Sequence, residues 1–161
     1  HRAMHAAFDR NPKHGITMQF LAKLMRLIGV DQIHSGTAVG KLVGSMQEVQ
    51  SIANVLREKN VKPFGNMLLE QNWQDLKPAF PVASGGMHPG LVPDVMEILG
   101  NECVILVSGG IHGHPKGTLA GAKATMQAIE ATMQGKSLQE AAKKNVELKQ
   151  ALEKWGYMRP K

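Results

Sequence analysis

Segments with a helical spacing of apolar residues alternate with short apolar runs along the chain. Within residues 17–28, Leu21, Leu24, Met25 and Ile28 fall on one helical face, and Gly29 follows as a stop signal. Similar patterns predict further helices over residues 45–56, 93–100, 117–134 and 137–155.

Three of these helices carry recognisable start signals. Ser45 with Glu48, and Ser137 with Glu140, have the spacing of capping boxes, in which each side chain satisfies an orphan backbone donor. Pro93 suits the first turn of a helix, where its missing N–H costs nothing.

Apolar runs over residues 30–35, 80–83 and 104–107 predict strands, and each is followed by a predicted helix. Such alternation is typical of parallel βαβ units, and fully apolar strands indicate a sheet covered on both sides or closed into a barrel. Residues 62–78, which include Trp73, read as irregular chain with a short strand or turn. Only three complete units are present, whereas a closed (β/α)₈ barrel needs eight strands and about 250 residues.

The fold class predicted is therefore α/β, as the C-terminal portion of a (β/α)₈ barrel with about strands six to eight. Residues 1–135 are expected to form the partial barrel and residues 136–161 a C-terminal helical extension. The chain opens at His1 without a strand before its first helix, which is typical of a truncated product of a longer protein.

The formal charge of +6 fits either a nucleic-acid binder or an enzyme with an anionic substrate. Basic residues are scattered and aromatic residues make up only 4% of the chain, so stacking surfaces for nucleic acid are poor and no nucleic-acid partner is expected. No apolar run approaches the roughly 20 residues of a membrane span, so no membrane partner is expected. The single cysteine, Cys103, lies in an apolar stretch, which predicts a buried, inert thiol and a cytoplasmic location.

Two turns of the same composition follow two of the predicted strands. Ser84-Gly85-Gly86 follows the run 80–83, and Ser108-Gly109-Gly110 follows the run 104–107. Glycine lets the backbone approach an anion closely, and barrels frequently bind phosphate with the loops after strands seven and eight. Either turn alone also fits a simple tight turn, but their repetition favours a phosphate site.

Two cationic side chains, Lys41 and Arg2, lie in other predicted loops. Lys41 is set among glycines in a loop that could close over a ligand, and it also fits a solvent-exposed lysine. Arg2 could hold phosphate oxygens through two parallel hydrogen bonds, and His1 beside it is a candidate base.

All seven histidines fall at predicted strand ends or in the loops that follow, His34 among them. This placement favours the catalytic face of a barrel, although individual histidines could simply hydrogen-bond to the backbone. The spacing of His112 and His114 does not fit a metal site.

Taken together, six segments resemble the large subunit of ribulose-bisphosphate carboxylase/oxygenase (RuBisCO). They run in the family's order and have the wording of its archaeal-type forms. The segments are His1-Arg2-Ala3-Met4-His5, Asn11-Pro12-Lys13-His14-Gly15, Ile33-His34-Ser35-Gly36-Thr37, Val39-Gly40-Lys41-Leu42, Pro81-Val82-Ala83-Ser84-Gly85-Gly86 and Gly113-His114-Pro115.

The resemblance implies roles for four residues before the first turn. His1 matches a histidine that accepts a proton, and Lys41 matches the loop lysine that stabilises the carboxylation transition state. Arg2 and His34 match residues that hold the phosphate at one end of ribulose 1,5-bisphosphate.

The resemblance also implies roles within the two turns. Ser84 matches a serine that hydrogen-bonds a substrate hydroxyl, and Gly86, with Gly85 beside it, matches a glycine at the second phosphate. Ser108 and Gly109 occupy the other turn of that phosphate site. The family usually has glycine where Ser108 stands, which leaves phosphate affinity at this position open.

A carboxylase of this family also needs Mg²⁺, which is bound by a carbamylated lysine and acidic residues. We expect none of these metal ligands within this chain. We expect the complete subunit to be a homodimer or larger homo-oligomer that acts on ribulose 1,5-bisphosphate with CO₂ or O₂, and the chain alone to be inactive. The alternative enzyme is a RuBisCO-like protein that enolises or isomerises a related sugar phosphate; Lys41 favours the carboxylase. A non-catalytic interaction fragment is the remaining alternative, since a partial barrel exposes strand edges.

Overall fold

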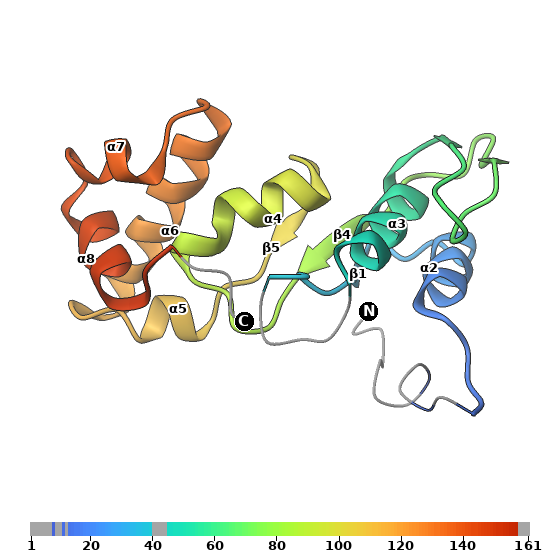
Figure 1. The fold of residues 1–161 in the computed structure, drawn as a ribbon, viewed down its shortest axis with the longest axis horizontal. Coiled ribbons are helices and arrows are strands. Elements are labelled where there is room, and N and C mark those ends of the chain that lie inside the picture. Colours follow the sequence, from blue (N-terminus) through green and yellow to red (C-terminus); the bar gives the residue numbers. More distant parts are fainter. Residues whose placement is uncertain (1–7, 9–10, 12, 40–44, 158–161) are drawn as a thin grey trace.

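The computed structural model describes residues 8, 11, 13–39 and 45–157. Strand–helix units occupy its first two thirds and helices alone its last third (Figure 1). The first elements are α2 (Met18–Leu27), β1 (Gln32–His34), α3 (Met46–Arg57), β2 (Asn60–Val61), β3 (Gln71–Asn72) and β4 (Phe80–Ala83). The later elements are the 3₁₀ turn η1 (Pro89–Leu91), α4 (Val92–Leu99), β5 (Val104–Ile105), α5 (Gly109–His112), α6 (Gly117–Met133), α7 (Leu138–Ala142) and α8 (Val146–Trp155).

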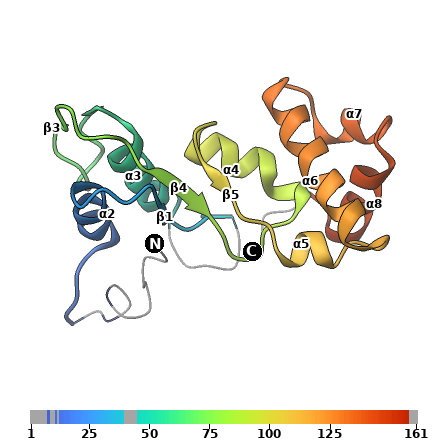
Figure 2. The same cartoon turned by 180° about the vertical axis from the view of Figure 1, so that it is seen from behind.

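The three predicted apolar strands form one parallel sheet in the order β1-β4-β5. His34 of β1 is in register with Val82 of β4, and Val82 is in register with Val104 of β5. Their carboxyl ends therefore lie along one edge, while helices pack beside the sheet (Figures 1 and 2). The predicted succession of parallel βα units is confirmed.

The third strand departs from its prediction. The apolar run 104–107 forms only the two-residue β5, both of whose residues are partly exposed, and Leu106 is 43% exposed. The expectation of a fully buried strand is wrong here because β5 pairs with β4 on one side only in the described sheet. In contrast, Pro81, Val82 and Ala83 of the central strand β4 are buried.

The helix starts follow the sequence signals closely. The Ser45 hydroxyl accepts the N–H of Glu48 at 3.1 Å, and the Ser137 hydroxyl accepts the N–H of Glu140 at 3.2 Å. Pro93 lies in the first turn of α4, as expected. The serine half of each capping box and the proline signal are thus confirmed.

The predicted helix 137–155 is in fact two helices. Asn145 has an extended backbone conformation between α7 and α8, and its side-chain amide donates to the carbonyl of Ala141 at 2.9 Å. Gln127 of α6 accepts the N–H of Leu148 at 3.0 Å, which satisfies a donor in the first turn of α8. Tertiary contacts with α6 therefore supply a cap for which the local sequence carries no signal.

The buried face of α2 differs from the predicted one. Leu21 is buried, but Leu24 and Ile28 are 39% and 65% exposed. Arg26 is instead 2% exposed, deep in the core of this part of the molecule. The apolar periodicity missed this because a charged residue occupies a core-facing position.

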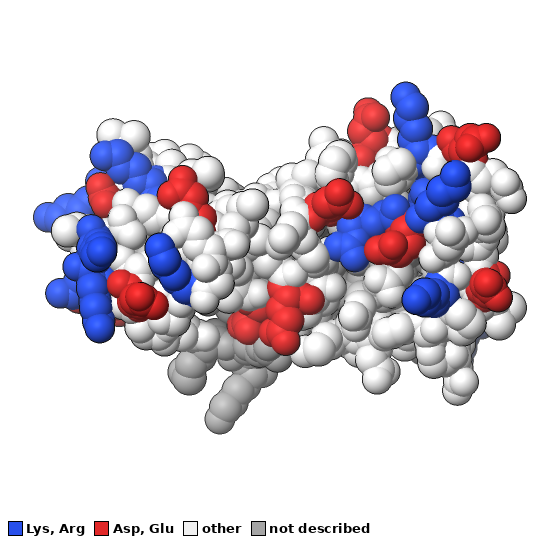
Figure 3. Space-filling view, turned by 90° about the horizontal axis from the view of Figure 1, so that it is seen from above, with Lys and Arg blue, Asp and Glu red and all other residues white. Residues whose placement is uncertain are grey.

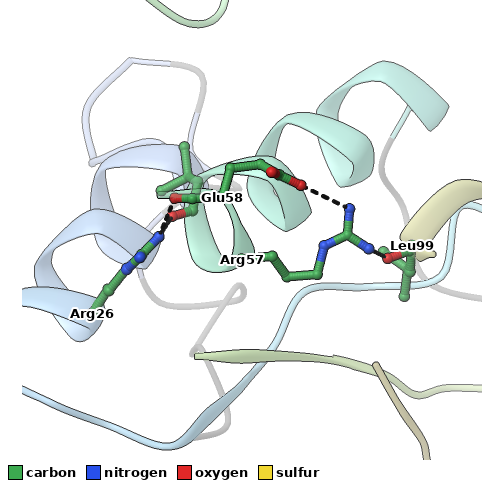
Figure 4. A network of polar contacts seen from close by, with 5 residues as sticks. Arg26, Arg57, Glu58 and Leu99 are labelled. Atoms are coloured by element: carbon green, nitrogen blue, oxygen red, sulfur yellow. Dashed lines mark hydrogen bonds and ion pairs between the residues drawn. The ribbon is translucent and has the colours of Figure 1, made fainter. Parts of the chain in front are cut away.

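Arg26 joins α2 to the end of α3 (Figure 4). Its guanidinium donates to the carbonyls of Val55 at 2.7 Å and Glu58 at 2.8 Å, and also to those of Lys77 at 3.1 Å and Leu76 at 3.3 Å. Burial lowers the pKa of Arg26, and the charge of Glu58 opposes that shift. The buried charge is thus matched by oxygen acceptors, as a buried cation requires.

The Arg26 guanidinium also lies over the ring of Trp73, 4.7 Å from its centroid. Trp73 is 3% exposed and sits in the segment 62–78, where β3 pairs antiparallel with β2, which lies just before this segment. The sequence predicted irregular chain with a short strand or turn there, and the two-residue strand β3 confirms the short strand. A neighbouring arginine, Arg57, donates to the carbonyl of Leu99 at the end of α4 and lies 3.6 Å from a Glu58 carboxylate oxygen (Figure 4).

On the face shown in Figure 3, basic and acidic side chains are interspersed at both ends of the molecule. None of the described helices is long and apolar enough to cross a lipid bilayer.

We predict that Arg26→Met destabilises the protein by about 2–3 kcal/mol, because four backbone carbonyls, one of them in a buried hydrogen bond, lose a charged donor. Equilibrium urea unfolding measures this change, and Trp73 fluorescence reports on the region that Arg26 covers. Lys23→Met is the matched control, since it removes a charge from the same helix at a partly exposed position. Its expected change is within about 0.5 kcal/mol. Equal destabilisation by both variants would contradict this role for Arg26.

Candidate functional site

The carboxyl edge of the parallel sheet brings together polar residues that are far apart in the sequence. His34 is the last residue of β1, and Ser84 directly follows β4. Nδ1 of His34 lies 2.6 Å from Oγ of Ser84, which is hydrogen-bonding distance. Ser84 is 7% exposed and His34 is half-buried, so the pair is shielded but accessible from one side.

The first Ser-Gly-Gly turn is anchored at both ends. Ala83 before it and Met87 after it are 0% and 3% exposed, within one buried apolar cluster beneath the turn. Gly85 and Gly86 have φ values of 102° and 71°, which residues with a side chain rarely adopt. The two glycines are therefore required by the backbone path, and they leave that path without side chains that would obstruct an anion.

The second Ser-Gly-Gly turn has a different conformation. Gly109 and Gly110 belong to the first turn of the short helix α5, and neither has a positive φ. The carbonyl of Ser108 accepts the N–H groups of Ile111 at 2.9 Å and His112 at 3.0 Å. Ser108 itself has a φ of −117°, so the backbone does not demand glycine at the position where the family usually has one.

The two turns are joined by direct packing. A Cβ atom on Gly110 would lie 2.5 Å from the carbonyl oxygen of Met87 and 2.6 Å from Cα of His88. Only glycine lets α5 approach the segment that follows the first turn so closely. The structure therefore places both turns at the same edge of the sheet, alongside the His34–Ser84 pair.

The sequence predicted no role for the two polar residues that follow β1, Ser35 and Thr37. Ser35 and Thr37 are 1% and 0% exposed, and the Ser35 N–H donates to the carbonyl of Val82 at 3.1 Å. This bond continues the pairing of β1 with β4 past the last strand residue. The signal in the sequence was a pair of polar residues, Ser35 and Thr37, on either side of Gly36 at the end of a predicted strand.

Three of the proposed site residues lie outside the described residues: His1, Arg2 and Lys41. Their expected roles rest on the sequence alone. Of the remaining candidates, Ser84, Gly85 and Gly86 form the first turn, and His34 lies beside it. Ser108 and Gly109 belong to the second turn.

The described histidines divide into different types. His114 is 4% exposed; its Nδ1 accepts the Lys116 N–H at 3.1 Å and its Nε2 donates to the Glu147 carbonyl at 2.9 Å. Both ring nitrogens are occupied by backbone partners, so His114 has the backbone-bonding role that remained open from the sequence. His112 lies within α5 and not in a loop, 3.2 Å from the Thr118 hydroxyl.

Burial affects two further titratable groups, one after the first turn and one just before β5. Burial lowers the pKa of His88, so its ring is neutral at pH 7. Cys103 is half-buried, so the expectation of a buried thiol is only partly correct; burial nevertheless raises the pKa of Cys103, which disfavours the reactive thiolate.

Within the residues that the structure describes, no group of three or more histidine, cysteine or acidic side chains could hold a metal ion. These residues therefore do not form a fitting site for Mg²⁺ on their own.

The geometry defines an α/β portion with a polar, glycine-rich carboxyl edge, and comparison with known proteins identifies its family. Residues 1–155 match the family model for the ribulose bisphosphate carboxylase large chain, catalytic domain. The ribulose bisphosphate carboxylase of Pyrococcus abyssi is 53% identical over 161 residues, covering 100% of this chain and 35% of the relative. That of Thermococcus kodakarensis is 55% identical over 163 residues, covering 99% of this chain and 37% of the relative.

Solved structures agree with this match. A crystal structure of an archaeal RuBisCO superposes with a TM-score of 0.89 at 53% identity, covering 99% of this chain and 37% of that one. The dimeric archaeal RuBisCO from Hyperthermus butylicus gives a TM-score of 0.88 at 49% identity, covering 98% and 37%. The chain thus belongs to the RuBisCO large-chain family and spans about a third of the length of these relatives. The family resemblance and the predicted C-terminal barrel portion are confirmed.

We predict that Gly110→Ala destabilises the protein by about 2 kcal/mol, because the new methyl group forces α5 away from Met87 and His88. Gly109→Ala is the matched control, since a Cβ there meets nothing within 4 Å. The control should change stability by no more than about 0.5 kcal/mol. Urea unfolding compares the two, and a Gly110→Ala variant as stable as the control would refute the close packing of the turns.

Proposed function

We propose that the complete protein containing this chain is a ribulose-1,5-bisphosphate carboxylase, which adds CO₂ to ribulose 1,5-bisphosphate and yields two molecules of 3-phosphoglycerate. The single observation that carries the proposal is the His34–Ser84 hydrogen bond beside two Ser-Gly-Gly turns that pack on one another. A bisphosphate needs two anion sites at a fixed separation, and the His34–Ser84 hydrogen bond links the His34 side to the joined turns that are proposed to form the other site.

The proposed roles at the first turn follow from hydrogen-bonding capacity. Ser84 has one hydroxyl, and the bond to His34 uses either its proton or a lone pair. In both cases the remaining capacity is oriented and available to a substrate hydroxyl. His34, with Arg2, is proposed to hold the phosphate at one end of the substrate.

The second phosphate is proposed to lie between the two turns. Backbone N–H groups at Gly85, Gly86 and Gly109 are the proposed donors, with Ser108 beside them. The negative φ of Ser108 supports this assignment, because the serine side chain is compatible with that backbone.

His1 and Lys41 are the proposed catalytic residues. His1 would accept a proton from the sugar, since imidazole titrates near neutral pH. Lys41 would stabilise the negative charge that develops when CO₂ adds to the enediolate. Both assignments rest on the family motifs in the sequence.

The remaining requirements are proposed to lie in other parts of the complete subunit. Mg²⁺, held by a carbamylated lysine and acidic residues, would polarise the sugar oxygens when bound. O₂ would compete with CO₂ as the second substrate. A cytoplasmic homodimer or larger homo-oligomer is proposed, and two matched structures are named as dimeric and octameric RuBisCO. The division into a partial barrel (1–135) and a helical extension (136–161) also stays a proposal.

A RuBisCO-like protein that enolises or isomerises a related sugar phosphate is the second candidate. It shares the phosphate sites but has no need of a lysine for the carboxylation step. Lys41 in its Gly40-Lys41-Leu42 setting favours the carboxylase.

Lys41→Ala in the complete subunit separates the two functions. We predict that it lowers fixation of labelled CO₂ by about 100-fold or more, as loss of a transition-state charge partner does. Exchange of the C3 proton of ribulose 1,5-bisphosphate with solvent should persist, because enolisation precedes CO₂ addition. Lys62→Ala, at an exposed lysine of the described structure, is the control and should leave both rates unchanged.

An unchanged carboxylation rate in Lys41→Ala would overturn the role of Lys41. Proton exchange without CO₂ fixation in the unmodified subunit would favour the second candidate. The isolated 161-residue chain serves as the blank, and turnover by it would contradict the expectation that the activity needs the complete subunit.

A further inference from the structure

The last residue of α8, Trp155, lies against both loops that follow the paired turns. The His88 ring stacks on the indole with centroids 6.0 Å apart and an interplanar angle of 17°. The His114 ring lies on the same indole at 6.4 Å, tilted by 52°. His88 is four residues beyond Ser84, and His114 is six residues beyond Ser108. One side chain therefore contacts the continuations of both turns.

Backbone segments also come close together at the same place, and one of these contacts requires glycine. A Cβ on Gly113 would lie 3.5 Å from Cζ2 of Trp155. A Cβ on Gly90, just after His88, would overlap the carbonyl oxygen of Gly156. The end of α8 thus touches the first loop through its backbone as well as through the indole.

Lys154 reinforces this end of α8. Its ammonium group lies 5.2 Å from the centroid of the Trp155 ring and donates to the carbonyl of Gly113 at 2.5 Å. The carbonyl is on the segment that leads away from the second turn. The Lys154 ammonium group therefore bridges the Trp155 ring and this loop through a cation–π contact and a charge-assisted hydrogen bond.

Trp155 is not needed to build the core of the helical end. The buried cluster there consists of Val92, Met96, Ala128, Ala131, Leu138, Leu148 and Leu152. Trp155 is only partly buried and lies outside that cluster. Its contacts are directed at the loops instead, which indicates a task other than filling the core.

We propose that Trp155 is a positioning residue that fixes the two Ser-Gly-Gly turns relative to one another by stacking on His88 and packing against Gly113. This inference rests on the proposed binding of a sugar bisphosphate by those turns. Displacement by about 1 Å at a positioning residue costs up to 100-fold in rate. Here the cost should appear in the affinity for the bisphosphate, because Trp155 acts through its phosphate sites.

The test uses the complete subunit carrying Trp155→Ala, with Trp155→Phe and Leu148→Ala alongside it. Trp155→Ala should raise KM for ribulose 1,5-bisphosphate by about 10-fold or more, while KM for CO₂ stays unchanged. Trp155→Phe keeps an aromatic face for His88 and should restore KM to within about 3-fold of the unmodified value. Leu148→Ala truncates a fully buried residue of the same helix, so it should lower the urea midpoint but leave both KM values unchanged.

His88→Ala provides a second route if Trp155→Ala does not fold, because it removes the stack from the loop side without altering α8. It should raise KM for ribulose 1,5-bisphosphate and leave KM for CO₂ unchanged. An unchanged bisphosphate KM in Trp155→Ala or, failing that variant, in His88→Ala would overturn the inference. An equal rise in Leu148→Ala, or no rescue by Trp155→Phe, would also overturn it by showing a general effect of destabilisation or of any change at this position.

The same assays keep this inference separate from the proposed function. If the unmodified subunit neither turns over ribulose 1,5-bisphosphate nor binds it in calorimetry, the proposed function fails and the inference fails with it. If the unmodified subunit is active and Trp155→Ala keeps its KM, only the positioning role fails.

Discussion

Parallel pairing of β1, β4 and β5 is the constraint on which the rest of the structure depends. Because the three strands run in one direction, the segments that follow them all begin at the carboxyl edge of the sheet. His34 and Ser84 meet for this reason, although 50 positions separate them. The direction of the strands is enough to bring these polar groups together at this edge. The packing of the loops and helices then holds the groups at a fixed spacing.

That spacing is maintained by close backbone and aromatic contacts at the carboxyl edge. Gly110 lets α5 rest on the segment after the first turn, and Trp155 packs over the continuations of both turns. At the opposite end of the strands, where the chain leads into β4, Arg26 joins α2 to the end of α3 through four carbonyl acceptors. All of these contacts join residues that are distant in sequence, so tertiary packing holds the short strands and their loops together.

Much of the fold was predictable because its signals are local. Apolar runs predicted the strands, and Ser45, Ser137 and Pro93 marked helix starts correctly. The burial of Arg26, the break at Asn145 and the exposure of β5 depend on tertiary partners, which no short window of sequence contains. The site followed the same division: motifs pointed to the two Ser-Gly-Gly turns, but the packing that joins them became visible only in three dimensions.

The central claim is that both turns and the His34–Ser84 pair border one binding mouth. A crystal structure of the complete subunit with an unreactive analogue of ribulose 1,5-bisphosphate tests it most directly. The account predicts one phosphate within hydrogen-bonding distance of backbone N–H groups at Gly86 and Gly109, and the other on the His34 side. An analogue with both phosphates bound away from these turns would contradict it.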